Sequence, residues 1–314
     1  MYYLGVDLGG THIAIGIVTP EGKIVHQGSV VTQREREYPA IVKDMAVLSE
    51  KLLDEAKIDL SEIKGAGIGS PGIPDNAQGL IVYANNLNFR NVPLRSEFQK
   101  YLNLPIHIEN DANCAALAES VIGAAREAAH SITITLGTGI GGGIVIDRKI
   151  YSGFNYSASE LGHMVMMIQG EACTCGRFGC WEAYASATAL IRQTRQAALQ
   201  NPNSLLNQLV VGNLENINAK TVFDAAKEGD STAMAVLERY QIYLAEGLIN
   251  IINILQPEVL VIGGGICAQG EYLLAPVRKL ISAGIYSKDI AQTAIKVAEL
   301  GNEAGIVGAA FLCQ

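Results

Sequence analysis

The 314-residue chain is short of positive charge and of cysteine, and each shortage excludes a class of protein. Its 23 lysines and arginines stand against 31 aspartates and glutamates, so the formal net charge is -8 and the isoelectric point is near 5.2. A chain without a basic field is not expected to bind the phosphate backbone of DNA or RNA. Its 6 cysteines are too scattered to form the disulfide framework of a small secreted domain.

No stretch of the sequence is apolar enough to span a bilayer. The longest candidate, from Leu248 to Leu255, is interrupted by Asn250 and Asn253 and is far too short. The first residues, MYYLGVDLGG, lack the basic and apolar regions of a secretory signal. We therefore expect a cytoplasmic protein with no membrane partner, and the length suffices for two domains of ordinary size.

Strand-like runs alternate with glycine turns along the chain, which predicts an α/β protein. The β-rich runs Tyr2–Val6, Ile13–Val18 and Lys23–Val31 are predicted to form a meander. Apolar residues at helical spacing predict a helix from Tyr38 to about Ala56. Further strands are predicted at Gly65–Gly69, Ile106–Glu109, Ser131–Leu136, Ile144–Ile146, Lys149–Tyr151 and Val259–Ile262, and further helices from Asn110 onward and at Tyr240–Leu255.

The two halves of the chain repeat one scheme. Placing LGVDLGGTHIAIGIV beside ITLGTGIGGGIVI shows strand, glycine turn and strand in both segments. This similarity predicts a duplicated architecture of two similar lobes. The polar segment Gln200–Lys220 is expected to be a surface excursion between helices.

Three glycine turns follow predicted strands, at Asp7–Thr11, Leu136–Gly143 and Ile262–Ile266. Glycine lets phosphate oxygens approach backbone N–H groups without a Cβ in the way, so the three turns predict a nucleotide site. The dinucleotide motif Gly-x-Gly-x-x-Gly is not favoured, because it needs a helix directly after the turn and the chain continues as IVIDRKIYSG, a β pattern. The chain also lacks the GxxxxGK[ST] sequence of a P-loop.

Asp7 precedes the first glycine turn, where its carboxylate is suited to hold Mg²⁺ directly or through water. Taken alone, a carboxylate at this position is more often a turn cap. The residues expected to contact the nucleotide are Asp7, Gly9, Gly10, Thr11, His12, Thr138, Gly139, Gly264 and Gly265.

A histidine and three cysteines, His163, Cys173, Cys175 and Cys180, have the number and types of ligand that close a structural zinc site. One residue separates Cys173 from Cys175, where common zinc knuckles have two to four, so the ligand types favour zinc more strongly than the spacing does. Two alternatives stay open. A Cys173–Cys175 redox pair leaves His163 and the third cysteine without a role, and a Cys173–Cys180 disulfide needs an oxidising compartment.

Four motifs together are typical of one family: LGVDLGGTHIAIG, ENDANCAALAE, TLGTGIGGGIV and ASELGHMVMMIQGEACTCGRFGCWEAYAS. By these motifs the chain resembles the ROK sugar kinases of the actin-like ATPase superfamily over essentially its whole length. The last motif is the most specific, because it joins Glu-x-x-His to the cysteine cluster. The chain departs from the family pattern at Ser159, where glycine is more common, and at Asn85, which replaces a proline.

The resemblance implies a two-lobed α/β fold, the actin-like ATPase (ribonuclease H-like) fold, with duplicated mixed-sheet lobes and a cleft between them. The smaller lobe is expected to contain residues 1–118 and 300–314. The larger lobe is expected to contain residues 119–299, including the zinc segment 163–180.

The resemblance also implies roles for single residues. Asp111 matches the catalytic base, and transfer of a phosphoryl group to a sugar alcohol does need a carboxylate within reach of the attacking hydroxyl. Because Asp111 stands where a strand ends and a helix starts, a helix N-cap is the competing interpretation. The residues that match the family's sugar contacts are Asn86, Asn110, Asp111, Glu160, His163 and Glu182. The zinc would then be a scaffold of the sugar pocket.

The activity implied is ATP-dependent phosphorylation of the 6-hydroxyl of a hexose, with glucose as the expected substrate, and with Mg²⁺ and structural Zn²⁺ as cofactors. Kinases of N-acetylmannosamine, fructose or allose are the alternatives, and the family commonly forms homodimers. A sugar-responsive repressor is less expected, since the family's repressors carry an N-terminal helix-turn-helix domain and the first glycine turn begins here at Asp7. An actin-type structural protein would not need the sugar and zinc residues.

Overall fold

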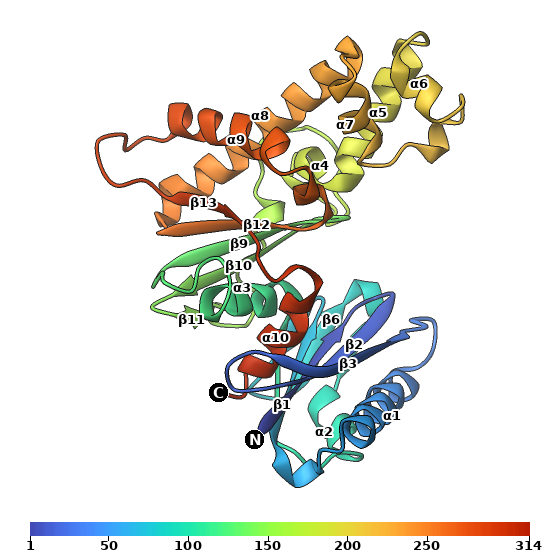
Figure 1. Ribbon diagram of the computed structural model, residues 1–314, viewed down its shortest axis with the longest axis vertical. Coiled ribbons are helices and arrows are strands. Elements are labelled where there is room, and N and C mark those ends of the chain that lie inside the picture. The colour runs from blue at the N-terminus through green and yellow to red at the C-terminus, as the bar shows by residue number, and fades with distance from the viewer. The chain divides into compact units, whose positions relative to one another are not determined.

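The computed structural model describes residues 1–314, and the chain forms two compact units (Figure 1). Unit 1 contains Met1–Thr133, Gly142–Ser159 and Ala298–Gln314, and unit 2 contains Ile134–Gly141 and Glu160–Val297. The lobe ranges implied by the family resemblance, 1–118 with 300–314 and 119–299, remain a prediction.

The chain contains both strands and helices, as the sequence predicts. The strands are β1 Tyr2–Leu8, β2 His12–Val18, β3 Ile24–Val31, β4 Ile63–Ser70, β5 Ile73–Asp75, β6 Leu80–Ala84, β7 Phe89–Val92, β8 Ile106–Asn110, β9 Ser131–Leu136, β10 Ile140–Ile146, β11 Lys149–Ile150, β12 Val259–Gly263 and β13 Ala294–Val297. The α-helices are α1 Tyr38–Ala56, α2 Leu94–Gln99, α3 Asp111–Val121, α4 Glu182–Ala185, α5 Ala187–Gln200, α6 Leu205–Leu209, α7 Thr221–Lys227, α8 Ser231–Leu255, α9 Glu271–Gly284 and α10 Ala304–Phe311.

Two five-stranded sheets have the same strand order, which confirms the predicted duplication. The orders are β3-β2-β1-β4-β8 and β11-β10-β9-β12-β13. In the first sheet β1 is antiparallel to β2 and parallel to β4, and β4 is parallel to β8. In the second sheet β10 and β11 are antiparallel, and β12 and β13 are parallel. Unit 1 also holds a three-stranded sheet, β5-β6-β7, which the sequence did not reveal.

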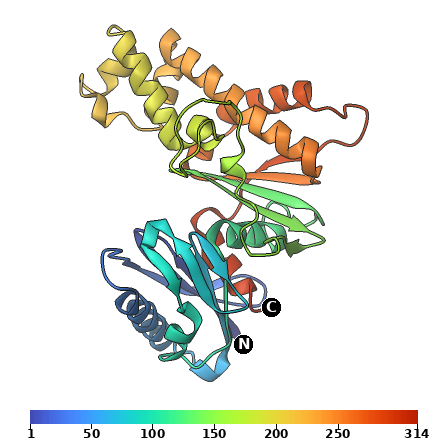
Figure 2. The same cartoon turned by 180° about the vertical axis from the view of Figure 1, so that it is seen from behind.

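The first sheet is covered on both faces, because successive side chains of a strand point to opposite sides. Leu4 and Val6 of β1 are buried in a core that includes Met45 of α1. On the other face Tyr3 packs in a cluster with Ile306 of α10. Figure 2 shows α10, the last helix of the chain, beside this N-terminal sheet. Segments from the two ends of the sequence therefore share the core of unit 1.

Glycines on the sheet surface let α10 approach this closely. A Cβ at Gly5 would lie 1.9 Å from the carbonyl oxygen of Ile306, and one at Gly67 would lie 1.7 Å from that of Ala309. A side chain at either position would push the helix away from the sheet and open a gap in the core.

The long helix α8 begins earlier than the sequence interpretation placed it, at Ser231 rather than Tyr240. Asp230 is its N-cap, since the carboxylate accepts a hydrogen bond from the Ala233 N–H at 2.8 Å. The same carboxylate accepts the Leu205 N–H at 2.8 Å and so joins α6 to α8. Burial would raise the pKa of Asp230, but these hydrogen bonds outweigh burial and lower it. An acidic residue before an apolar helical pattern, here Asp230, is a helix start signal that is visible in the sequence.

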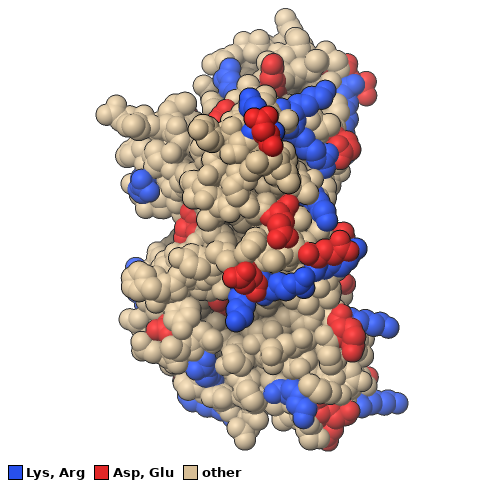
Figure 3. Space-filling model, turned by 90° about the vertical axis from the view of Figure 1, so that its left-hand side faces the viewer, with Lys and Arg blue, Asp and Glu red and all other residues tan.

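The segment expected to be an excursion lies between α5 and α7 and contains the short helix α6. No helix in the structure is both long and apolar enough to cross a membrane. On the face drawn in Figure 3, lysine and arginine side chains are intermingled with aspartate and glutamate rather than gathered in a continuous basic patch.

Candidate active site and metal centre

The carboxyl ends of three parallel strands of unit 1 meet at one edge of its first sheet. The register pairs Asp7 of β1 with Gly69 of β4, and Gly69 with Glu109 of β8. Asp111 follows β8 directly as the first residue of α3. A Cβ at Gly69 would lie 3.6 Å from the Asp111 Cα, so this strand end lies against the start of the helix. Ligands of open α/β sheets commonly bind at this edge.

The cap of α3 is Asn110, not Asp111. Asn110 Oδ1 accepts the N–H groups of Ala112 at 2.9 Å and Asn113 at 3.3 Å, and its Nδ2 donates to the carbonyl of Gly72 at 3.1 Å. Asp111 uses Oδ1 to accept the same Ala112 N–H at 2.8 Å. The N-cap role, which was the alternative to a catalytic role for Asp111, is thus filled by Asn110.

Asp7 and Asp111 are both carboxylates whose pKa is raised by burial. Burial raises the pKa of Asp111, and the hydrogen bond from the Ala112 N–H offsets only part of this. Burial, followed by the negative charge of Asp111, raises the pKa of Asp7 to about 6. Two carboxylates in one poorly solvated site each disfavour the other's ionised form, and such pairs are typical of functional sites. A cation placed between them would relieve this repulsion.

The first glycine turn lies against the segment that contains Asn86. The turn is closed by the Gly9 N–H, which donates to the His12 carbonyl at 3.0 Å. A Cβ at Gly10 would lie 3.1 Å from the carbonyl oxygen of Asn86, which belongs to the short 3₁₀ helix Asn85–Leu87. Thr11, His12 and Asn86 are exposed. A predicted nucleotide turn and a predicted sugar contact are therefore neighbours within unit 1.

The other two glycine turns lie side by side in unit 2. Gly264 has a φ of 96°, and a Cβ there would lie 2.2 Å from the carbonyl oxygen of Leu136. At Gly137 and Gly265 a Cβ would have no neighbouring atom within 4 Å, so these two positions face open space. Thr138 is exposed, and its carbonyl accepts the hydroxyl of Thr188 at 2.8 Å. Backbone groups of both turns are thus accessible to a ligand.

Glu182 joins the second glycine turn to the cysteine segment. Its Oε2 accepts the Ile140 N–H at 2.8 Å, and its Oε1 accepts the Thr174 hydroxyl at 3.4 Å. A Cβ at Gly139 would lie 2.2 Å from the same Oε2. The sequence pointed to Glu182 as a sugar contact but gave no sign of this bond to the turn.

The four predicted zinc ligands are brought together in unit 2. All four ligand atoms lie within 4.8 Å of one another. His163 Nδ1 is 3.5 Å from Cys173 Sγ, and the Sγ atoms of Cys175 and Cys180 are 3.7 Å apart. Zinc at the centre of a tetrahedron would set the N···S distance at about 3.6 Å and the S···S distance at about 3.8 Å, given its usual bond lengths. The residues present fit a Zn²⁺ ion, and every cysteine of the chain is free.

His163 also faces Glu160, another predicted sugar contact. The second ring nitrogen, Nε2, lies 3.8 Å from Glu160 Oε2, and the Glu160 side chain is 53% exposed. Metal-bound histidines commonly donate this nitrogen to a carboxylate, which fixes the orientation of the ring. The His163 imidazole therefore lies between the metal position and the exposed Glu160 carboxylate.

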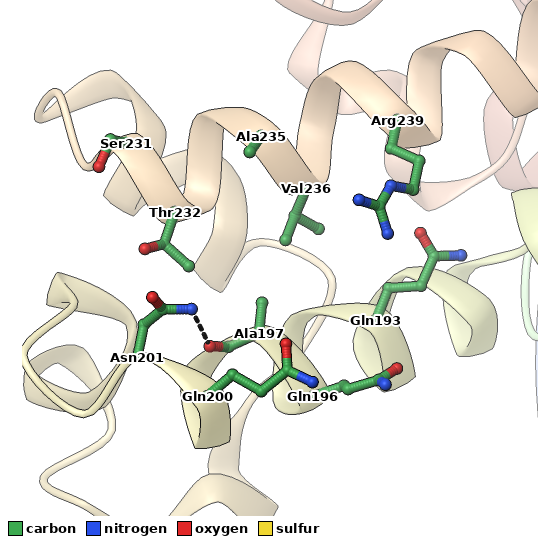
Figure 4. A pocket seen from close by; sticks show the side chains of 10 residues that line it. All are labelled: Gln193, Gln196, Ala197, Gln200, Asn201, Ser231, Thr232, Ala235, Val236 and Arg239. Carbon is green, nitrogen blue, oxygen red and sulfur yellow. Dashed lines mark hydrogen bonds between the residues drawn. The ribbon is translucent and has the colours of Figure 1, made fainter.

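A pocket of about 520 Å³ lies elsewhere in unit 2, between α5 and α8 (Figure 4). Amide side chains, hydroxyls and one guanidinium line it, from Gln193, Gln196, Ala197, Gln200, Asn201, Ser231, Thr232, Ala235, Val236 and Arg239. None of the residues predicted to bind sugar, nucleotide or metal is among them. The predicted site is defined by strand ends, turns and the cysteine segment instead.

Comparisons with known proteins agree with the motifs. The model of the ROK family matches residues 3–314. A glucokinase of Halalkalibacterium halodurans is 36% identical over 314 residues, which cover 100% of this chain and 95% of that protein. A ROK family glucokinase from Streptomyces griseus, solved in complex with glucose and AMPPNP, has a TM-score of 0.84 at 34% identity, over 99% of both chains. A xylose repressor of Caldicellulosiruptor bescii is 31% identical over 97% of this chain and 76% of its own length. The chain has the actin-like ATPase fold and belongs to the ROK family.

Proposed function

We propose that the chain is an ATP-dependent sugar kinase that converts glucose to glucose 6-phosphate, with Asp111 as the catalytic base. The observation that carries the proposal is the position of Asp111 at the common edge of three parallel strands, where burial raises its pKa. The names of the relatives support the reaction, since one is a glucokinase and one was solved with glucose and an ATP analogue.

In the proposed mechanism, Asp111 accepts the proton of the sugar 6-hydroxyl as the γ-phosphoryl group of ATP moves onto that oxygen. A raised pKa suits this role, because a stronger base takes the proton of the hydroxyl more readily. Asp7 would hold the Mg²⁺ that accompanies ATP. Backbone N–H groups of the glycine turns would stabilise the negative charge of the phosphates.

The sugar would be held by amides and carboxylates, which fix the direction of each hydroxyl. These are the side chains of Asn86, Asn110, Glu160, His163 and Glu182. Zn²⁺, when bound, would act as a structural ion that fixes His163 and, through it, Glu160. A homodimer remains the expected assembly.

The substrate is tested by measuring ADP release with ATP and a panel of glucose, N-acetylmannosamine, fructose and allose. We expect glucose to give the highest kcat/KM. A higher kcat/KM with another sugar would identify that sugar as the preferred substrate, and ADP release with none of the sugars would refute the kinase proposal.

The base is tested by Asp111→Asn, which keeps the size of the side chain and removes its ability to take a proton. We expect kcat to fall by about 10²- to 10⁴-fold, with the affinity for sugar, measured by calorimetry, changed much less. Asp54→Asn on the exposed surface of α1 is the matched control. Near-normal turnover of Asp111→Asn would show that another group is the base.

A sugar-responsive regulator is the second candidate, because a xylose repressor is 31% identical over 97% of this chain. The two functions differ in one observable. A regulator would bind sugar in the calorimeter but would release no ADP when ATP is added.

A further inference from the structure

Glu109 is a buried carboxylate that the sequence interpretation placed only at the end of a strand. It is 7% exposed. Its Oε1 accepts hydrogen bonds from the Asn110 N–H at 2.9 Å and from Asn113 Nδ2 at 3.0 Å. Its Oε2 accepts the Ser152 hydroxyl at 2.8 Å. Burial of a carboxylate is costly, and it is tolerated where several donors satisfy the oxygens, as they do here.

The donors on Oε1 belong to the segment that carries the proposed base. Asn110 is the N-cap of α3, Asp111 is the first residue of that helix, and Asn113 lies in its first turn. Asn113 is 2% exposed, so its amide is fixed in the protein interior. Glu109 therefore holds the start of α3 from two sides, through the backbone and through a buried side chain.

The donor on Oε2 belongs to a loop far along the chain. Ser152 is the first residue of this loop, 152–159, and its carbonyl accepts the Ala158 N–H at 3.1 Å, which closes the loop on itself. The loop contributes little to the core, since Phe154 is 98% exposed. It leads directly into Glu160. The Ser152 hydroxyl is thus a principal anchor of the segment that precedes a proposed sugar contact.

We propose that Glu109 is a positioning residue that fixes the base-carrying start of α3 and the loop 152–159 relative to each other. Both segments belong to unit 1. The role rests on the proposed kinase function, because it assigns Glu109 to the same reaction. Glu109 touches neither sugar nor nucleotide in this proposal and acts through Asn110, Asp111 and Ser152.

Three variants and one control test the proposal. Ser152→Ala breaks only the link to the loop, and Glu109→Ala breaks all three hydrogen bonds. Glu109→Gln restores them without charge, because its oxygen can accept the two nitrogen donors and its amide can donate to the Ser152 hydroxyl. Glu119→Ala is the control, since Glu119 is also on α3, is 1% exposed, and accepts the Ala124 N–H at 2.8 Å and the Leu300 N–H at 2.9 Å.

The kinetic readout compares kcat/KM for the sugar with the KM for ATP. We expect kcat/KM for the sugar to fall by about 10²-fold in Glu109→Ala, the cost of a small misplacement of catalytic groups, and by a smaller factor in Ser152→Ala. The KM for ATP should stay unchanged, and Glu109→Gln should recover most of the loss. Glu119→Ala should lower the thermal midpoint while leaving both kinetic constants in place.

The structural readout is hydrogen exchange of the peptide that spans 152–159. Exchange should be faster in Ser152→Ala and Glu109→Ala and unchanged in Glu119→Ala. Unchanged exchange in Ser152→Ala, or kinetic constants of Glu109→Ala that match those of the control, would overturn the proposal. If the wild-type chain phosphorylates no sugar, the kinase proposal fails by itself, while the exchange rates still decide whether Glu109 holds the loop.

Discussion

Replacing Cys175 by serine tests whether the metal centre serves the sugar site or only the stability of the fold. Cys175 is exposed, so the substitution removes a thiolate ligand with little loss of packing. Structural zinc sites contribute about 10–16 kcal/mol of binding free energy near neutral pH. Shared equally among four ligands, one thiolate accounts for roughly 3–4 kcal/mol, which weakens zinc binding by roughly 10²- to 10³-fold.

Loss of the metal should release the segment around it, because that segment has little core of its own. Ile168 is 88% exposed and Phe178 is 60% exposed. His163 would then lose its fixed orientation and Glu160 its partner at 3.8 Å. Glu182 should keep its bond to the Ile140 N–H at 2.8 Å, which does not involve the metal, and lose its bond to the Thr174 hydroxyl in the released segment.

We therefore expect sugar binding to suffer before nucleotide binding. Loss of one or two hydrogen bonds from the sugar hydroxyls to charged groups would weaken its binding by about 10- to 100-fold, while nucleotide affinity should change by less than about threefold. Metal content by plasma mass spectrometry and separate calorimetric titrations with glucose and an ATP analogue measure these quantities. Cys313→Ser is the control, because Cys313 lies outside the cluster, in unit 1, and is not among the residues proposed to bind sugar or nucleotide. Full zinc content in Cys175→Ser, or an equal loss of both affinities, would refute the reasoning.

Three further substitutions test contacts in unit 2. Gly139→Ala would place a methyl carbon 2.2 Å from Glu182 Oε2, so the carboxylate must move. Calorimetry should show the sugar and nucleotide affinities both falling by about tenfold, and unchanged affinities would contradict this. Gly247→Ala would place a Cβ 2.1 Å from Cε2 of Trp181. The cost of overpacking, about 1–3 kcal/mol, should outweigh the gain in helix propensity of about 1 kcal/mol, so the thermal midpoint should fall. A raised midpoint would contradict this prediction. Asp230→Ala removes a helix cap and should lower the free energy of unfolding by about 1 kcal/mol at pH 7. Because the folded pKa of Asp230 is lowered, this contribution is present above the unfolded pKa of about 3.9 and is lost as the pH falls through the folded value. Urea unfolding should therefore show the variant and wild type converging in acid, and a constant difference would contradict the assignment.

The sequence predicted the parts of the fold that local patterns determine. The helix expected from Tyr38 to Ala56 has those bounds, and the three strands of the N-terminal meander lie where the β-rich runs placed them. Local patterns suffice in such segments, because each is either amphipathic or a short apolar run and ends at a recognisable turn signal. The sheet β5-β6-β7 was missed because its strands are short and its first strand, Ile73–Asp75, contains a proline.

Contacts between distant segments could not be predicted in the same way. The family motif predicts Glu182 as a sugar contact, but no local pattern connects it with Ile140, 42 positions away. The bond between Glu109 and Ser152 joins residues 43 positions apart. A motif identifies which residue types a site needs, whereas the partner that fixes each side chain depends on how the chain returns in three dimensions.

The position of the cysteine ligands depends on the conformation of the backbone between them as well as on the number of residues that separate them. The single residue between Cys173 and Cys175 departs from the spacing of common zinc knuckles. In the structure a tight turn runs through this pair, with the Gly176 N–H donating to the Cys173 carbonyl at 3.0 Å. Gly176 and Gly179 have φ of 87° and 78°, a region that favours glycine, so the chain can reverse after Cys175 and return before Cys180. The two glycines therefore compensate for the short interval, because they bring Cys175 and Cys180 to an Sγ separation of 3.7 Å, which a tetrahedral zinc ion requires.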